Sequence, residues 1–463
     1  MSLTLADFPA PPAVPSAGQL AEAEHLALVC VAGTDAARAL VDDLCARIAP
    51  HVDAGRGNKR RAAGEAKVRA AVAAVVGGVL RRWGGGEPRL AFRSLSADAF
   101  TGSPIGRRQF GPVVGALSDL GLLARHGGIS FPLGEWEDGT PWFDRRAARF
   151  WPTADLLSLA ARHGIRRDAL RDHFRPVPPA KAPVVKDPIG LKSFELDKRG
   201  RPAAPRPLRI AAGDAEAARI RADVERHNAF AAGVAVEGCT PPRWRRVFRG
   251  GWAMGGRWYA AGSDGAYQTM PAADRLRALR IAGEPVAEID VKGAHLALLC
   301  GLAGRPMPAG DDPYAVEGVP RDVVKAWVTA TLGKGSPVRR WSERAPAGCA
   351  VHDPKAIGAA IVARIPALAE PAAVVPTRLA DRFGGDPRPI LTHYLMGLEA
   401  WAVTLALTAL REVRGVLALP MHDALTVPAA AVDHATAALT DAFEEVAGIV
   451  PGLAVRSVEA VAA

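Results

Sequence analysis

Two short apolar runs that each end in an aspartate constrain the fold of this chain most strongly. Residues 285–290 read Pro-Val-Ala-Glu-Ile-Asp, and residues 415–423 read Gly-Val-Leu-Ala-Leu-Pro-Met-His-Asp and continue as Ala-Leu-Thr-Val. Short apolar runs of this kind indicate buried strands, so the terminal acids stand at the rim of a sheet. We expect Asp290 and Asp423 to lie close enough there to share divalent metal ions. An aspartate that only caps the following helix is the alternative for either position alone.

A pair of basic residues lies between these two runs. Arg321 and Lys325 are four residues apart in a helical pattern and therefore project from the same helix face. Two cations on one face suit a triphosphate, whose oxygens accept charge-assisted hydrogen bonds. Such a pair alone more often marks a solvated helix face, and its place between the two acidic runs is what favours phosphate binding.

The composition of the chain indicates which kinds of partner it can bind. The 463 residues carry a net charge of +10 and the pI is about 9.7, which favours a polyanionic partner such as nucleic acid. Hydrophobic residues make up 49% and charged residues 23%, as in soluble globular proteins, and the Ala-rich stretches are too short to span a bilayer. The five cysteines show no CxxC spacing and residues 1–15 show no secretory signal. We therefore expect a cytoplasmic protein with no membrane partner.

The chain divides into regions of different composition. Residues 1–85 read as a helical region, with helices expected at 21–29, 36–48 and 63–83. Residues 86–174 mix helical and strand patterns. Residues 175–213 are rich in Pro and Lys and are expected to form a linker, and residues 214–463 form the remaining domain.

The second region has a recognisable order of elements. A short helical stretch at 95–100, a Ser-Pro turn and an amphipathic helix at 107–122 precede a Gly-rich hairpin, and residues 148–153 lead into a helix at 154–163. This order resembles the winged helix-turn-helix of plasmid replication initiators. The resemblance implies that Arg107 and Arg108 begin a recognition helix and bind DNA. A winged helix that makes only protein contacts is the alternative.

The last region carries four elements in a familiar order. They are Trp-Ala-Met-Gly-Gly-Arg-Trp-Tyr at 252–259, the run around Asp290, the helix 321–335, and the His-Asp hairpin at 417–427. Together they resemble the polymerase motifs of family A DNA polymerases and of phage and mitochondrial single-subunit RNA polymerases. The resemblance implies an α+β fold in which a right-hand palm with small helical fingers follows the winged helix.

The resemblance also implies roles for individual residues. Asp290 and Asp423 would be catalytic ligands of two Mg²⁺ or Mn²⁺ ions. The incoming nucleoside triphosphate would contact Arg321, Lys325, His295 and Gly333. Arg257 and His422 would contact the DNA template, with or without a primer. Glu399, on a helix at 391–413, is a candidate supporting acid.

Four positions depart from the family pattern. His295 stands where family A DNA polymerases use a glutamate to exclude ribose, and Gly333 stands where they use a tyrosine; Val291 and Ala424 also differ. Sugar preference is therefore open, and an RNA polymerase or primase-like enzyme is an alternative. The resemblance as a whole implies a template-directed nucleotidyltransferase of the kind that a plasmid, phage or integrated element would need. A non-catalytic DNA-binding replication initiator or regulator is a further alternative, and a two-carboxylate hydrolase is the weakest.

Overall fold

The protein forms two compact units, and each is described by itself. The computed structural model describes residues 8–54, 62–100, 102–128, 130–135, 141–145, 147–197, 202–262, 264–308, 312–342 and 345–457. Unit 1 comprises Met1–Pro183 together with Gly262–Met270, and unit 2 comprises Val184–Ala261 together with Pro271–Ala463. The chain therefore leaves unit 2 after Ala261, contributes a short segment to unit 1, and returns.

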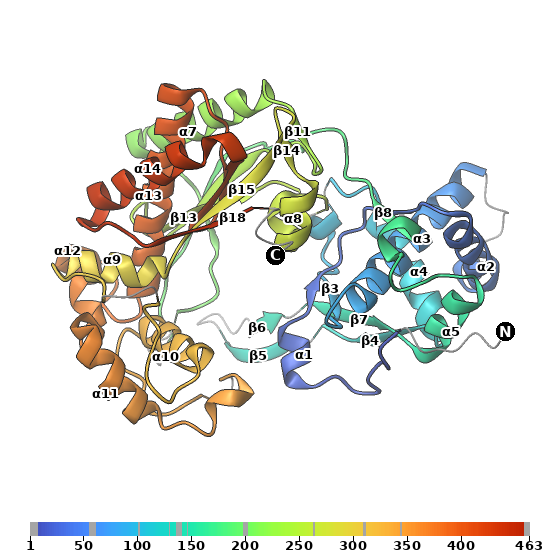
Figure 1. Cartoon of the computed structure of the whole chain (residues 1–463), viewed down its shortest axis with the longest axis horizontal. Helices are drawn as coiled ribbons and strands as arrows, with labels where there is room; N and C mark the ends of the chain where they lie inside the picture. Colours follow the sequence, from blue (N-terminus) through green and yellow to red (C-terminus); the bar gives the residue numbers. More distant parts are fainter. Residues whose placement is uncertain are drawn as a thin grey trace. The chain divides into compact units, whose positions relative to one another are not determined.

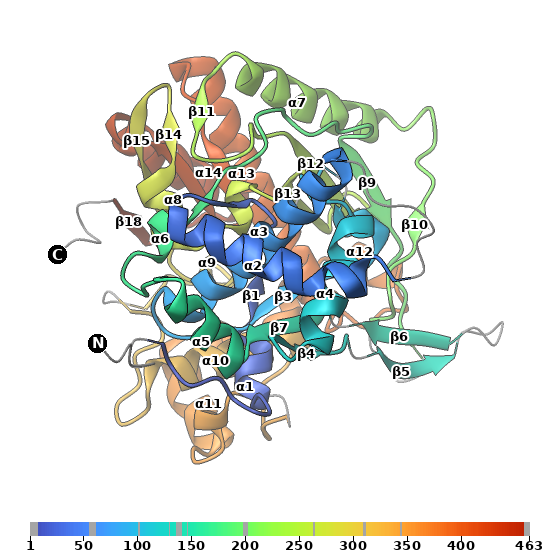
Figure 2. The ribbon, with the colours of Figure 1, turned by 90° about the vertical axis from the view of Figure 1, so that its right-hand side faces the viewer.

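Unit 1 is a mixture of helices and short strands (Figures 1 and 2). Its elements are α1 (Ala17–Ala21), β1 (Glu24–His25), β2 (Cys30–Ala32), α2 (Asp35–Val52), α3 (Ala62–Gly84), β3 (Ala91–Arg93), η2 (Ala97–Phe100), α4 (Arg107–Asp119), β4 (Leu123–His126), β5 (Ser130–Glu135), β6 (Pro141–Arg145), β7 (Ala148–Pro152), α5 (Ala154–Arg162), α6 (Leu170–His173), β8 (Phe174–Pro176) and η3 (Tyr267–Thr269).

The core of unit 1 lies between its helices and a sheet with strand order β1-β3-β7-β4. Helix α4 shows why the sequence folds this way. Its residues Phe110, Val113 and Leu117 recur at helical spacing and are all buried, whereas Arg107 and Arg108 in its first turn are exposed. The amphipathic pattern read from the sequence therefore gives a helix with its apolar face in the core.

The expected helix at 21–29 is wrong. Helix α1 ends at Ala21, and β1 then pairs in parallel with β3. Leu26 and Leu28 are buried while Ala27 between them is only half-buried, which is the two-residue period of extended chain. The many Ala and Leu residues of this stretch favour a helix locally, but pairing with β3 decides its conformation.

The elements expected for the winged helix are present in their expected order. The stretch η2, a turn, α4 and the strand β4 are followed by the β5–β6 hairpin, and β7 returns to pair antiparallel with β4. Figure 2 shows the β5–β6 hairpin projecting from the end of the β4–β7 pair. Residue 129 of the expected hairpin lies outside the described residues. Assignment of this arrangement to the winged-helix class stays a prediction.

Unit 2 has a mixed α+β composition, as expected from the sequence. Its elements are β9 (Ile189–Lys192), β10 (Pro207–Leu208), α7 (Ala215–Ala232), β11 (Val236–Glu237), β12 (Trp244–Arg249), β13 (Gly255–Ala260), α8 (Ala272–Ala278), β14 (Arg280–Ile281), β15 (Glu284–Val291), α9 (Ala294–Leu302), α10 (Arg321–Lys334), η4 (Ala347–Cys349), α11 (Pro354–Arg364), η5 (Pro366–Leu368), η6 (Pro371–Val374), α12 (Thr377–Asp381), α13 (Leu391–Arg414), β16 (Leu419–Met421), β17 (Ala424–Pro428), η7 (Ala429–Ala431), α14 (Val432–Ala447) and β18 (Leu453–Arg456).

Two sheets organise unit 2. One has the strand order β11-β14-β15-β17-β16, with β18 pairing to β15, and the other has the order β10-β9-β12-β13. Helix α13 packs against α14, α9 and β13 (Figure 1). Helices α10, α11 and α12 lie in the sequence between α9 and α13, where small helical fingers are expected. Assignment of the sheet to a palm stays a prediction.

The Pro- and Lys-rich segment 175–213 differs from the expected linker. It contributes β9, which pairs in parallel with β12, and β10, which pairs antiparallel with β9. The pairing partners lie far along the chain, so the local composition gives no sign of them. Within this segment, the residues up to Pro183 belong to unit 1 and those from Val184 belong to unit 2.

Helix α13 is the one helix of the described part that is long and apolar enough to cross a membrane by length and composition. Half of its most apolar stretch, 50%, is buried inside the protein, and core helices of soluble proteins pass the same test. The absence of a membrane partner stays a prediction. The five cysteines are all free thiols, and the cytoplasmic location expected from them is likewise a prediction.

Candidate active site

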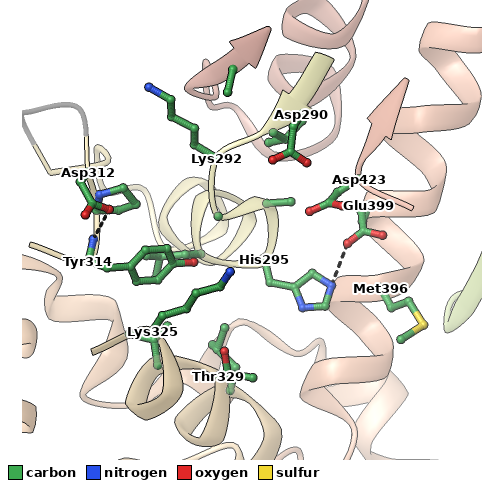
Figure 3. Close-up of a pocket in the computed structure, with 18 of the residues that line it drawn as sticks. Asp290, Lys292, His295, Asp312, Tyr314, Lys325, Thr329, Met396, Glu399 and Asp423 are labelled. Atoms are coloured by element: carbon green, nitrogen blue, oxygen red, sulfur yellow. Dashed lines mark hydrogen bonds and ion pairs between the residues drawn. The ribbon is translucent and has the colours of Figure 1, made fainter. Parts of the chain in front are cut away.

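Asp290 and Asp423 lie at adjoining ends of two paired strands. Strands β15 and β17 are antiparallel with Asp290 opposite Ala424, the residue after Asp423. The Val291 N–H donates to the Asp423 carbonyl oxygen at 3.3 Å. Figure 3 shows both carboxylates directed into the same pocket. The strand-terminal placement predicted from the two apolar runs is therefore what the structure has.

The turn between β16 and β17 orients Asp423. His422 adopts a left-handed backbone conformation with φ of 57°, which is uncommon for a residue with a side chain. Its imidazole is exposed, and its ring lies 6.3 Å from the Tyr259 ring, edge on. His422 does not line the pocket that holds Asp423. The predicted nucleic-acid contact of His422 would therefore have to be made outside this pocket.

Negative charge accumulates around Asp423. Burial raises the pKa of its carboxyl to about 6, and the nearby charges of Glu399 and Asp290 act in the same direction. Asp290 has a cationic neighbour, since Nη2 of Arg456 lies 3.0 Å from its Oδ2. The site therefore holds one carboxylate with a partner and one whose ionisation is opposed by its surroundings.

Glu399 on α13 contacts side chains of two other elements, β13 and α9. It projects from α13 with its side chain 1% exposed, and it accepts hydrogen bonds from Arg257 Nε at 2.6 Å and Nη2 at 2.8 Å. His295 Nε2 on α9 lies 3.0 Å from its Oε2, as Figure 3 shows. Burial works to raise the pKa of Glu399, but the contacts with His295 and Arg257 outweigh it and lower that pKa. Glu399 is therefore an ionised anchor for both partners, a supporting role that fits the expectation.

Gly293 allows a close approach between β15 and the loop that carries Tyr314. Its φ is 63°, and a Cβ added there would stand 3.0 Å from the Tyr314 hydroxyl. Helix α9 begins at the next residue, Ala294, and carries His295 in its first turn. Both the positive φ and the nearby Tyr314 hydroxyl favour a glycine at position 293. The turn thus brings His295 to the pocket that Asp290 also lines.

Helix α10 presents the two predicted cations, in different environments. Arg321 Nε lies 3.0 Å from Asp312 Oδ2, and its guanidinium stacks 5.2 Å from the centre of the Tyr314 ring. Lys325 is exposed, and Figure 3 shows its amine directed into the pocket. Both residues face the same cavity. Their common direction, expected from the four-residue spacing, is present in the structure.

A single pocket of about 890 Å³ collects most of the predicted residues. The predicted residues along its wall are Arg257, Asp290, His295, Arg321, Lys325, Gly333, Glu399 and Asp423. Sequence reasoning missed several other polar lining residues, which are Lys292, Asp312, Tyr314, Thr329, Thr392 and Arg456. Asp312 and Tyr314 lie in a loop without a pattern of its own. Arg456 ends the short strand β18, whose residues Leu-Ala-Val-Arg show no alternation of apolar and polar side chains that would mark it.

The donor set fits divalent metal ions only with help from a substrate. Among the described residues there is no group of three or more His, Cys, Asp or Glu side chains placed to hold a metal. Mg²⁺ is commonly bound through one or two carboxylates together with waters and substrate phosphates. Asp290 and Asp423 supply that many carboxylates. Burial first, and then the charges of Glu399 and Asp290, raise the pKa of Asp423, and a bound cation would favour its ionised form. Ala424 adds no further ligand.

The predicted DNA-binding arginines lie in unit 1. Arg107 and Arg108 occupy the first turn of α4 and are exposed, and Gly106 precedes them without a side-chain cap. Arg108 also lines a pocket of about 220 Å³ together with Lys67 of α3. This surface has the positive charge and accessibility that a phosphate backbone requires.

Comparisons with known proteins add only a distant likeness. No known family model and no curated protein matches the chain. Among solved structures, the chain is similar to the POL domain of Pol1 from M. smegmatis in complex with DNA primer–template and dNTP. The identity is 13% and the TM-score 0.33, over 96% of this chain and 70% of the other. So weak a likeness carries no argument, and function has to be argued from the geometry of the pocket.

Proposed function

We propose that this chain is a nucleic-acid polymerase that adds nucleotides in a DNA-templated reaction. The observation that carries the proposal is the single pocket in which Asp290 and Asp423 lie on adjoining strand ends while Lys325 enters from α10. Transfer of a nucleotidyl group requires acidic ligands for metal ions and a cation for the triphosphate in one cavity. A hydrolase with two carboxylates would not require the cationic face of α10.

The residues of the pocket would have different roles in binding metal ions and the triphosphate. Asp290 and Asp423 would hold Mg²⁺ or Mn²⁺, which supplies Lewis-acid activation of the attacking hydroxyl and charge stabilisation of the leaving pyrophosphate. Lys325 has a flexible, exposed amine that can follow the phosphates as their charge increases. Arg321 is held by Asp312 and Tyr314, so it offers the pocket a guanidinium with fixed partners.

The proposal is tested with the full chain, primed and unprimed DNA templates, separate dNTP and NTP pools, and Mg²⁺ or Mn²⁺. We expect template-dependent extension. Lys325→Ala should raise the nucleotide KM and lower kcat, together reducing kcat/KM by about tenfold or more. Lys334→Ala is the matched control, because Lys334 lies on the same helix but outside the pocket. A chain that binds DNA but incorporates no nucleotide under any of these conditions would be a non-catalytic initiator or regulator.

One observation favours use of ribonucleotides, as in an RNA polymerase or primase. The pocket wall carries His295, whose imidazole is held by Glu399, and an imidazole can exchange hydrogen bonds with a 2′-hydroxyl. We expect weak discrimination between NTP and dNTP in single-nucleotide incorporation. His295→Glu should shift use toward dNTP. Strong rejection of NTP that is unchanged in His295→Glu would mean that His295 only supports Glu399.

Unit 1 is proposed to bind duplex DNA through the first turn of α4. Replacing Arg107 and Arg108 together by alanine should weaken binding and reduce the salt dependence of the affinity by about one to two units of slope. Arg162→Ala with Arg175→Ala is the matched control, since both are exposed arginines elsewhere in unit 1. Equal binding by the α4 double variant and the parent at every salt concentration would move DNA binding to another surface.

A further inference from the structure

Arg456 contacts Asp290 although another acid lies opposite it. Strand β18 pairs antiparallel with β15, and the register sets Arg456 opposite Glu288. Glu288 is already bound by Arg275, and both of those side chains are only 5% exposed. Arg456 therefore reaches diagonally along β15 to Oδ2 of Asp290, at 3.0 Å. The pairing of β18 and the occupied state of Glu288 together direct this guanidinium to the site.

The surroundings of the Arg456–Asp290 pair make Arg456 the local counter-charge of Asp290. Asp423 and Glu399 bring further negative charge to the same cavity, and Arg257 is engaged by Glu399. Lys292 and Lys325 also line the cavity, but no contact between either of them and Asp290 is present in the described part of the chain. A guanidinium on the oxygen that would bind a divalent ion repels that ion at short range.

We propose that Arg456 is an internal counter-cation, which occupies Oδ2 of Asp290 in the metal-free protein and has to withdraw when a divalent ion binds there. The inference rests on the proposed function. The side chains of Arg456 and Asp290 are 49% and 33% exposed, so the guanidinium can move into solvent without opening the core. Arg456 thereby offsets part of the negative charge of the acidic site without metal, and it weakens the affinity of that site for metal.

The test is Mn²⁺ binding to the full chain, followed by the electron paramagnetic resonance signal of free Mn²⁺ and without nucleotide. Arg456→Gln should bind Mn²⁺ about tenfold more tightly than the parent, because it removes a repelling charge near the ion. Arg456→Lys keeps the charge and should stay near the parent. Arg414→Gln is the matched control, since it removes an exposed arginine of unit 2 that does not line the pocket.

The variant Asp290→Asn distinguishes failure of the proposed metal site from failure of the proposed role of Arg456. If Asp290→Asn loses Mn²⁺ binding but Arg456→Gln binds as the parent or more weakly, the counter-cation role is overturned while the metal site stands. If Mn²⁺ binding does not depend on Asp290 in any variant, the metal site fails and the role of Arg456 fails with it. Tighter binding by Arg456→Gln alone, with Arg456→Lys and Arg414→Gln unchanged, supports the inference.

Discussion

Unit 1 and unit 2 each contain several Arg–Asp pairs, and two of these pairs, one from each unit, differ in almost every physical respect. In unit 1, Arg93 and Asp264 are fully buried and joined by parallel hydrogen bonds of 2.7 and 2.8 Å. Asp264 also accepts from the Leu28 N–H, and Arg93 also donates to the carbonyl oxygens of Leu26 and Ala99. In unit 2, Arg456 and Asp290 meet through one contact of 3.0 Å at a partly exposed rim.

The difference separates a structural pair from an exchangeable one. Arg93 and Asp264 are surrounded by protein donors and acceptors, so neither charge is left to bind a ligand. The pair also fixes the returning segment Gly262–Met270 within unit 1. Asp290 keeps access to solvent and a cavity in front of it. Ion pairing alone therefore does not mark a functional site; exposure and the charge of the neighbours do.

Breaking the buried pair should have the largest effect on stability. Asp264→Asn leaves Arg93 buried without its counter-charge and should destabilise unit 1 by about 3–5 kcal/mol. Hydrogen–deuterium exchange of amides in α4 and β3 measures this locally. Asp290→Asn makes the same change in the exposed pair and should alter exchange in unit 2 by less than about 1 kcal/mol. Similar losses in both variants would erase the distinction between the pairs.

The acids of unit 2 should also give a pH dependence with a defined sign. Because the pKa of Asp423 is raised to about 6, its protonated form stabilises the folded state. That contribution is full below the ordinary aspartate pKa of 3.8 and is lost as pH rises through 6.

Urea unfolding in EDTA at pH 5 and pH 7 measures the loss. Relative to Asp423→Asn, the parent should lose on the order of 1–2 kcal/mol between these pH values. Asp433→Asn, at an exposed position of α14, is the control and should behave as the parent. A parent and an Asp423→Asn variant with parallel pH dependence would show that Asp423 ionises normally.

The smallest effect on stability is expected from the exposed Arg456–Asp290 pair itself. A double-mutant cycle with Asp290→Asn and Arg456→Gln in metal-free buffer should give a coupling of about 0.2–1 kcal/mol that decreases with salt. Thermal unfolding of the four proteins provides the measurement. A coupling of several kcal/mol that is insensitive to salt would place the pair with Arg93 and Asp264 as a structural one.

Several elements of unit 2 could be predicted from the hydrophobic pattern and residue spacing within a single segment. The apolar runs before Asp290 and Asp423 form β15 and β16, and the run after Asp423 forms β17. The spacing of Arg321 and Lys325 places both on one face of α10. The amphipathic pattern of α4 was equally readable. These elements carry their own periodicity, so a single sequence suffices to find them.

The remaining features depend on pairing between distant segments. Residues 21–29 have helical composition, but pairing with β3 makes part of them a strand. The segment taken as a linker supplies β9 because β12 offers it an edge more than fifty residues away. Arg456 reaches Asp290 only through the register of β18 against β15. Register between distant strands cannot be read from either strand alone.

The central claim is tested most directly by single-turnover primer extension with Asp290→Asn and Asp423→Asn. Each replaces an anionic metal ligand by a neutral side chain of the same shape. We predict that either variant loses nucleotide addition by a factor on the order of a thousand or more. Both should keep the parent's fold by circular dichroism. Asp441→Asn, on the exposed part of α14, should retain the parent's rate. Extension at the parent's rate by either active-site variant would contradict the claim.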